Sequence, residues 1–268
     1  HVTDAPTLTY NLRRDSMSHS NATPDWTAWF PWAKFPQFTP FGASGEPPNN
    51  MPARPVLNYH PPLVSVVIPV GPGHEVYLQD TLDSLVAQTF QQWEVIVVND
   101  TGHSWKKDET ALTDRGLLFF SGYPFVRLVE FDDGGRRGPA VSRNRGIRVS
   151  LAPFFALLDA DDYAQPLWLE LLYKAIKEYG GWAYTDWLDQ YGEYKEAEDF
   201  DIRRAVHKMP GPSTGIYSKA EWEIVGGFDE EALGWEDYDY LLMLIAQGSC
   251  GVRIKYPGFT YRYHTGTR

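Results

Sequence analysis

Residues 154–162 of the chain read Phe154-Phe155-Ala156-Leu157-Leu158-Asp159-Ala160-Asp161-Asp162. A short apolar run of this kind predicts a strand that is buried on both faces, as in a parallel sheet. The three acids follow where that strand would leave the sheet. Because ligands of open α/β sheets bind beyond the carboxyl ends of the strands, these acids are candidates to hold a divalent metal that carries a phosphate. The alternative is a solvated acidic turn, or a cap for the helix that follows Pro166.

The segments on either side alternate between buried strands and amphipathic helices. We predict strands at 63–70, 93–100, 125–130, 154–158, 182–186, 215–218, 252–255 and 259–263. We predict helices at about 76–86, 105–118 (weakly), 139–149, 166–179 and 236–247, with an irregular stretch at 187–212. Such alternation predicts an α/β fold with a mostly parallel sheet flanked by helices.

Residues 1–62 differ from the remainder in being rich in proline and aromatic residues. The prolines exclude long helices and central strands. We therefore predict an extended N-terminal arm that packs on the following domain, or on a neighbouring subunit of a homo-oligomer. The alternative is a surface that stacks on sugars or binds a partner. The domain proper is expected to span residues 63–268.

The composition excludes several classes of function. The chain has 35 acidic residues against 24 Lys and Arg, and its net charge of -11 argues against nucleic acid as a partner. Its one cysteine, Cys250, excludes an internal disulfide and a cysteine-based zinc site. No run approaches the ~20 apolar residues of a membrane helix, and no signal peptide is recognisable. We expect a cytoplasmic piece of a longer protein, peripheral to a membrane only through missing or partner segments.

Further candidate site residues lie at the ends of other predicted strands. Pro69 and Val70 end the first strand and Asp100 ends the second, so a nucleotide could lie across this edge of the sheet. Asp100 could accept from a base N–H, which suits a pyrimidine such as uracil, or it could be a turn or cap residue. Arg143 has the forked donors that suit phosphate.

Two acids, Glu236 and Asp237, open a predicted helix, where the helix dipole favours negative charge. One of them could instead act as a general base on a hydroxyl group. Adjacent helical residues point about 100° apart, so the two cannot share one task. His264 follows near the end of the chain and is incidental unless it meets the metal.

From about Leu63 to its end, the chain resembles the inverting glycosyltransferases of family 2, which have the GT-A fold. The matching pieces are Ser65-Val66-Val67-Ile68-Pro69-Val70, Leu82-Asp83-Ser84-Leu85-Val86-Ala87-Gln88-Thr89, Val95-Ile96-Val97-Val98-Asn99-Asp100, Ser142-Arg143-Asn144-Arg145-Gly146-Ile147, Leu158-Asp159-Ala160-Asp161-Asp162, Val225-Gly226-Gly227-Phe228-Asp229 and Glu236-Asp237-Tyr238-Asp239. Each is a weak pattern alone, but they occur in the order of the family. The first 62 residues are not covered.

The resemblance implies roles for the donor-side residues. Asp100 is similar to the acid that reads the base, and Asp159 and Asp161 to the two acids of the DxD motif, which binds Mn2+ or Mg2+ on the diphosphate. Arg143 matches an element near the donor. His264 is similar to a histidine that completes the metal site in some relatives. The resemblance thus implies a nucleotide-sugar donor, most simply a UDP-sugar, bound by residues 63–165.

The resemblance also implies the chemical step. Asp237, in the pair with Glu236, is similar to the base that deprotonates an acceptor hydroxyl, and a single displacement inverts the anomeric carbon. Residues 166–268 would bind a carbohydrate or glycoconjugate acceptor, with Trp187, His207 and Trp235 as contact residues. Two other functions stay open from the sequence: a non-catalytic module that binds glycans or nucleotides, and a sugar nucleotidyltransferase.

Two departures from the family pattern affect the donor site. Asn99 stands where relatives often have a second Asp, and residues 71–73 are Gly-Pro-Gly where relatives usually have polar residues. The resemblance therefore implies less about contacts to the base at the end of the first strand than about the rest of the donor site.

Overall fold

The computed structural model describes residues 61–105, 126–131, 135–232 and 234–263. The N-terminal arm up to residue 60, nearly all of the weak helix predicted at 105–118, and His264 lie outside these residues. The following description concerns the described residues alone.

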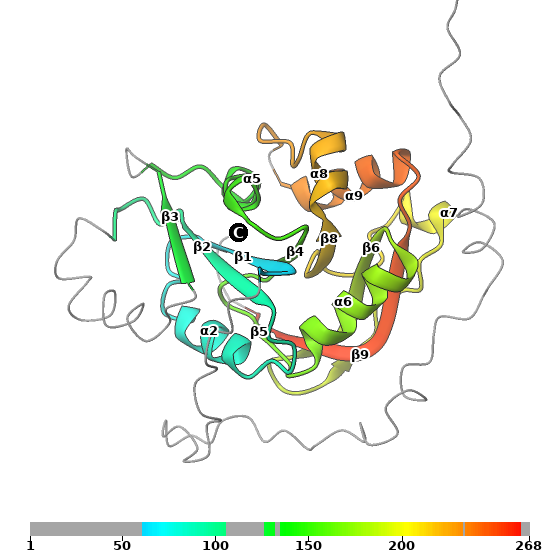
Figure 1. Cartoon of the computed structure of the whole chain (residues 1–268), viewed down its shortest axis with the longest axis horizontal. Coiled ribbons are helices and arrows are strands. Elements are labelled where there is room, and N and C mark those ends of the chain that lie inside the picture. Colours follow the sequence, from blue (N-terminus) through cyan, green and yellow to red (C-terminus); the bar gives the residue numbers. More distant parts are fainter. Residues whose placement is uncertain (1–60, 106–125, 132–134, 233, 264–268) are drawn as a thin grey trace, which may run out of the picture.

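The elements follow one another in the order drawn in Figure 1. The strands are β1 (Val64–Val70), β2 (Trp93–Asn99), β3 (Val126–Glu130), β4 (Phe154–Leu157), β5 (Tyr163–Ala164), β6 (Trp182–Asp189), β7 (Tyr194–Lys195), β8 (Gly215–Ser218) and β9 (Gly251–Tyr261). The helices are α2 (Leu78–Val86), α5 (Pro139–Val149), α6 (Trp168–Tyr179), α7 (Ile202–Ala205), α8 (Lys219–Val225) and α9 (Glu236–Ala246).

The strands form one mixed sheet in the order β3-β2-β1-β4-β8-β6-β9-β5, with β7 paired to β6. Strands β1 to β4, β6 and β9 run in one direction, whereas β5, β7 and β8 run in the other. This confirms the predicted α/β class with a mixed, mostly parallel sheet. Among the helices of the described residues, none is both long enough and apolar enough to cross a membrane.

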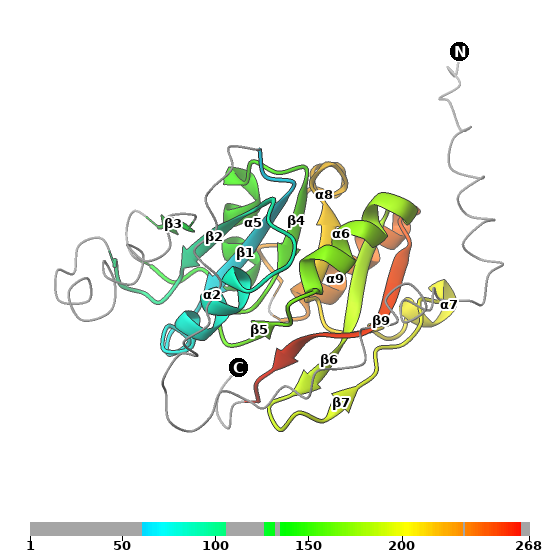
Figure 2. The same ribbon diagram turned by 60° about the horizontal axis from the view of Figure 1, so that its bottom comes forward.

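Helices cover both faces of the sheet (Figures 1 and 2). The apolar residues of α2 and α6 pack with Val66 and Ile68 of β1 in one core cluster. Those of α5, α8 and α9 pack with Val67 in the other. Successive residues of a strand point to opposite faces, so the apolar run of β1 supplies both clusters. This is why the strand reads as continuously hydrophobic.

Helix α5 lies very close to the sheet because of Gly146. A Cβ atom at this position would lie 2.5 Å from Cγ1 of Val67 and 3.1 Å from Cγ2 of Val98. Only glycine permits this approach. It brings the start of α5 down to the edge of the sheet where β1 and β2 end.

The second half of the sheet departs from the sequence prediction. The two strands predicted at 252–255 and 259–263 are one strand, β9, which continues through Pro257. The pairing of β6 with β9 shifts register around Asp186, which lies opposite Pro257 after Thr185 has paired with Ile254. This irregularity accommodates the proline. The short elements β5, β7, α7 and α8 were not predicted, because two to seven residues carry too little periodicity.

Candidate active site

The strands β1, β2 and β4 end at one edge of the sheet, as the sequence predicts. Val70 pairs with Asn99, and the N–H of Asp100 donates to the carbonyl of Val70 at 2.9 Å. The N–H of Leu158 donates to the carbonyl of Val67 at 3.3 Å, just before the acidic stretch begins. The candidate donor residues therefore share this edge.

Asp100 holds the loop that precedes α5. One carboxylate oxygen accepts from the N–H of Arg137 at 2.6 Å, and the other accepts from the N–H of Gly138 at 2.7 Å. Gly138 is the N-cap residue of α5 and has a φ of 91°. Asp100 therefore stabilises a turn, which was one of the two roles that the sequence allowed. Each carboxylate oxygen also has a second lone pair, so Asp100 can accept a further hydrogen bond from a base. That role stays a prediction.

The end of β1 offers little side-chain chemistry. Val70 is fully buried in the core, so its side chain contacts protein rather than ligand. Pro69 is half-buried and pairs with Val98. The next polar side chain is His74, which the sequence reasoning missed because the stretch read only as a turn. Its Nδ1 lies 3.5 Å from Oδ2 of Asp161.

Arg143 joins the two halves of the candidate site. From α5, its Nη1 donates to Oε1 of Glu236 at 2.7 Å and its Nη2 donates to Oδ1 of Asp159 at 3.3 Å. The Arg143 side chain is only 6% exposed. Burial lowers the pKa of Arg143, but the charges of Asp159, Glu236 and Asp237 raise it above its ordinary value. The guanidinium thus pairs with two carboxylates, and a direct contact with a phosphate stays a prediction.

Asp237 lies near this ion-pair cluster. It is half-buried in the first turn of α9, directly after Glu236. Burial, together with the negative charge of Asp237, raises the pKa of Tyr217 on β8. The negative charge of Asp237 therefore acts on both Tyr217 and Arg143. The structure brings the acid at the start of α9 to the acids after β4, although more than seventy residues separate them in the sequence.

The third acid of the stretch, Asp162, is buried in the protein. Its Oδ1 accepts from the N–H of Arg262 at 3.0 Å, whereas its Oδ2 has no hydrogen-bond partner among the described residues. Burial and the charges of Asp159 and Asp161 raise the pKa of Asp162 well above its ordinary value. In the protein alone, Asp162 therefore favours its neutral form, whereas a cation nearby would favour its charged form.

The described residues contain no group of three or more His, Cys, Asp or Glu side chains arranged to hold a metal ion. A cation bound at Asp159 or Asp161 would need further ligands from elsewhere. Magnesium-type ions commonly bind through one or two carboxylates, with substrate phosphates and water completing the shell. The acids after β4 fit that pattern. The predicted ligand His264 lies outside the described residues, two positions beyond Arg262.

Asn144, which follows Arg143 on α5, connects that helix to the turn after α8. Its Nδ2 donates to the carbonyl of Phe228 at 2.8 Å, and its Oδ1 accepts from the N–H of Phe228 at 2.9 Å and from Nε1 of Trp222 at 3.1 Å. A Cβ on Gly227 would lie 2.7 Å from that Oδ1. The Arg143-Asn144 pair and the Gly226-Gly227 turn therefore form one packed unit.

The three candidate acceptor residues lie in different surroundings. Trp187 is half-buried and stacks on Phe259, with ring centroids 6.4 Å apart. His207 is exposed just beyond α7, and Ala205 of that helix accepts a hydrogen bond from the Tyr238 hydroxyl at 3.0 Å. Trp235 is 74% exposed and directly precedes Glu236. Of the three, Trp235 is the nearest in sequence to the candidate base Asp237, two positions before it.

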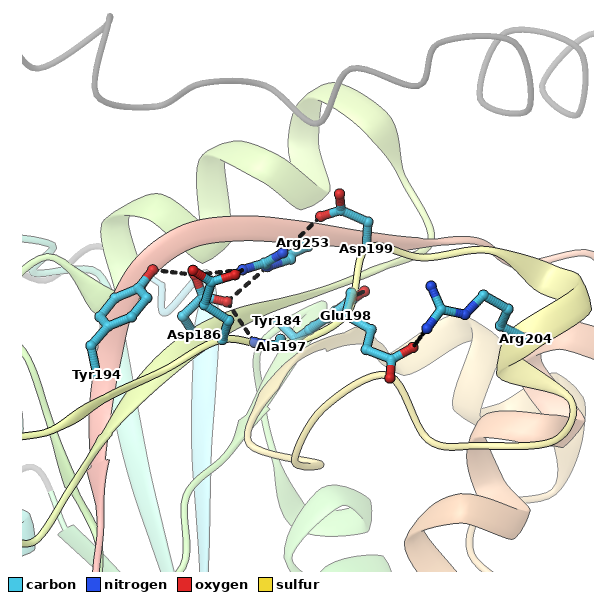
Figure 3. A network of polar contacts seen from close by, with 9 residues as sticks. Tyr184, Asp186, Tyr194, Ala197, Glu198, Asp199, Arg204 and Arg253 are labelled. Atoms are coloured by element: carbon cyan, nitrogen blue, oxygen red, sulfur yellow. Dashed lines mark hydrogen bonds and ion pairs between the residues drawn. The ribbon is translucent and has the colours of Figure 1, made fainter.

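A buried ion pair stiffens the second half of the sheet (Figure 3). Arg253 donates to both oxygens of Asp186, at 2.7 and 3.0 Å, and to Asp199 at 3.0 Å. Asp186 also accepts hydrogen bonds from the Tyr194 hydroxyl and, at 2.8 Å, from the N–H of Ala197. The network fastens residues 194–199 to β6 and β9. It gives Asp186 a structural role.

Comparison with known proteins is consistent with this arrangement. The family described as "Glycosyl transferase family 2" matches residues 65–224. The uncharacterized glycosyltransferase MJ1057 of Methanocaldococcus jannaschii is 25% identical over 202 residues, which are 69% of this chain and 65% of the relative. The uncharacterized glycosyltransferase YibD of Escherichia coli is 33% identical over 153 residues, 56% of this chain and 42% of the relative.

Among solved structures, the fold is similar to that of S. aureus TarS 1-349 in complex with UDP-GlcNAc. The TM-score is 0.61 with 21% sequence identity, over 76% of this chain and 59% of that chain. This likeness is one of fold. The fold and the edge of the sheet define a GT-A domain, and the chain belongs to glycosyltransferase family 2. It spans about two thirds or less of the length of these relatives.

We predict that Arg143→Met lowers the free energy of unfolding by about 3 kcal/mol, because Glu236 would be left buried without its cation. The double variant Arg143→Met/Glu236→Gln should lose less than the sum of the single variants, since the unpaired charge is gone. Urea unfolding measures these changes. Arg148→Met is the matched control on α5, where the exposed pair with Glu230 should contribute less than about 1 kcal/mol. Equal losses in both variants would contradict the bridging role of Arg143.

Proposed function

We propose that this chain is a metal-dependent, inverting glycosyltransferase that transfers a sugar from a UDP-sugar to an acceptor hydroxyl. One observation carries the proposal: Arg143 pairs at once with Asp159 after β4 and with Glu236 at the start of α9. This links Asp159, an acid proposed for the donor, to Glu236, the residue directly before Asp237, which we propose as the base. A diphosphate leaving group and a general base must lie on either side of one anomeric carbon, and the linkage supports such an arrangement.

The choice of donor is supported by the solved relatives. S. aureus TarS has been crystallised in complex with UDP and with UDP-GlcNAc. In this chain, Asp100 lies at the end of β2, where a base could bind, and Asp159 and Asp161 lie at the end of β4, where a diphosphate could bind. We assign Asp161, the second acid of the DxD pattern, as the main metal ligand, while Asp159 pairs with Arg143. Bound there, Mn2+ or Mg2+ would stabilise the charge of the departing diphosphate.

Asp237 acts as the general base in this proposal. Its carboxylate takes the proton of the acceptor hydroxyl as that oxygen attacks the anomeric carbon. The bond from the anomeric carbon to the diphosphate oxygen breaks on the opposite face, which inverts the configuration. Glu236 holds Arg143 and is a positioning residue. Arg143 keeps the carboxylate of Asp159 oriented toward the donor edge.

Trp235 supports a carbohydrate acceptor. It has a φ of 62°, and it alone among the described non-glycine residues has a positive φ. A left-handed conformation costs a non-glycine residue roughly 1–2 kcal/mol, and such strain tends to persist at functional sites. The ring covers little of the protein, since Trp235 is 74% exposed. An aromatic face beside the base could stack on the apolar face of an acceptor sugar.

Asp161→Asn should abolish metal-dependent transfer while leaving the fold intact, because the amide removes the charge that binds the cation. UDP release from a panel of UDP-sugars, with Mn2+, Mg2+ or EDTA, measures this effect. Thermal unfolding serves as the control for the fold. Unchanged turnover in the variant would rule out the metal assignment, and UDP-sugar turnover that is equal in EDTA would rule out metal dependence.

Asp237→Asn should lower the chemical step by roughly 10²–10⁴-fold, because an amide cannot accept the hydroxyl proton. Donor binding should stay near that of the parent protein. Single-turnover kinetics separate the two quantities, and calorimetric titration with UDP gives the affinity. If the variant loses UDP affinity and retains the chemical rate, the base is another residue.

Trp235→Gly should leave the free energy of unfolding equal or raise it by about 1 kcal/mol, because glycine adopts a positive φ without strain. The same change should weaken acceptor binding by about tenfold, equivalent to about 1.4 kcal/mol. Urea unfolding gives the first quantity, and the KM for oligosaccharide acceptors gives the second. Trp235→Phe, which keeps an aromatic face, should retain most of the affinity. A glycine variant with unchanged KM would remove Trp235 from the acceptor site.

A further inference from the structure

His74 lies beside the proposed metal-binding acid although nothing in the family pattern marks it. It is in the turn between β1 and α2, where its N–H donates to the carbonyl of Gly71 at 3.2 Å and its carbonyl accepts from the N–H of Tyr77 at 3.1 Å. Gly73 before it has a φ of 83°. This turn leads the chain back over the edge of the sheet at which β4 also ends. These hydrogen bonds fix the main chain at His74, from which the side chain extends toward Asp161.

The side chains of His74 and Asp161 approach each other from two different elements. Nδ1 of His74 lies 3.5 Å from Oδ2 of Asp161, and the side chains are 42% and 13% exposed, respectively. This separation exceeds the usual hydrogen-bond range of about 2.7–3.2 Å. Mg2+ and Mn2+ prefer octahedral shells, in which two ligands about 2.1 Å from the ion and at right angles to each other are about 3.0 Å apart. The two atoms, 3.5 Å apart, would therefore need to approach by only about 0.5 Å to bind one metal as neighbouring ligands.

We propose that His74 is a ligand of the divalent cation that binds at Asp161. This inference rests on the proposed function, because the cation is the one that carries the donor diphosphate. With one imidazole and one carboxylate from the protein, the remaining positions would be filled by diphosphate oxygens and water. That division agrees with the lack of any three-residue ligand group in the described part of the chain.

The charges around the pair favour a cation there. Asp159 and Asp162 flank Asp161, and the buried Oδ2 of Asp162 has no hydrogen-bond partner in the described residues. A divalent ion at Asp161 would offset part of this negative charge. An imidazole ligand would also set the preference among metals, because nitrogen suits Mn2+ better than it suits Mg2+, which demands oxygen ligands. The chain should therefore bind Mn2+ more tightly than Mg2+ in the presence of UDP.

The test uses the full chain with Mn2+ and UDP. Electron spin-echo spectra of bound Mn2+ should show the modulation of a directly bonded imidazole nitrogen. His74→Asn and His74→Ala should remove that modulation and weaken Mn2+ binding by about tenfold or more. The free aquo-ion signal in the EPR spectrum gives the affinity. Neither readout depends on turnover.

Two controls separate the possible outcomes. Val76→Ala changes an exposed neighbour in the same turn and should leave both readouts unchanged. His264→Asn removes the other candidate imidazole. If the nitrogen modulation survives in both His74 variants, or is absent from the parent protein while Mn2+ and UDP still bind, His74 is not a ligand. If the parent protein binds no Mn2+ with UDP at all, the metal-dependent function itself fails, which is a different result.

Discussion

The candidate site depends on one buried guanidinium. Arg143 reaches from α5 to Asp159 after β4 and to Glu236 at the start of α9, at 3.3 and 2.7 Å. Glu236 is only 11% exposed, so its charge needs a cation beside it, whereas Asp159 is 40% exposed. The position of α5 makes this possible, because Gly146 lets the helix lie directly on Val67 and Val98. The bridge fixes the segment after β4 relative to the first turn of α9, which carries both Glu236 and Asp237.

Further hydrogen bonds on either side of Arg143 hold α5, and with it the bridge, in place. Asn144 follows Arg143 and fastens the turn at Gly227 and Phe228 through both its donor and its acceptor atoms. Asp100 fastens the start of α5 through the N–H groups of Arg137 and Gly138. Asn144 and Asp100 belong to motifs that the sequence associates with ligand binding, and in the structure both form hydrogen bonds within the protein. These two residues therefore support the geometry of the site, whether or not they also contact a substrate.

The two halves of the sheet are stabilised by different interactions. The first half is a run of parallel strands whose apolar residues pack against α2 and α5. The second half contains a bent strand, β9, and a buried pair between Arg253 and Asp186 that fastens the segment at 194–199. The first half thus depends mainly on apolar packing, and the second half also depends on buried charge pairing.

The sequence alone determined the α/β class, the strands at β1, β2 and β4, and the family, because continuous apolar runs predict buried strands and the motifs at their ends follow in the family's order. It also indicated Asp159, Asp161 and Asp237 as candidates. Only the tertiary structure decided which of these side chains meet. Nothing local to Arg143 shows that its two partners are Asp159 and Glu236, and nothing local to His74 shows that it faces Asp161. Contacts between residues far apart in the chain depend on strand order and helix packing, and neither is encoded in any single stretch.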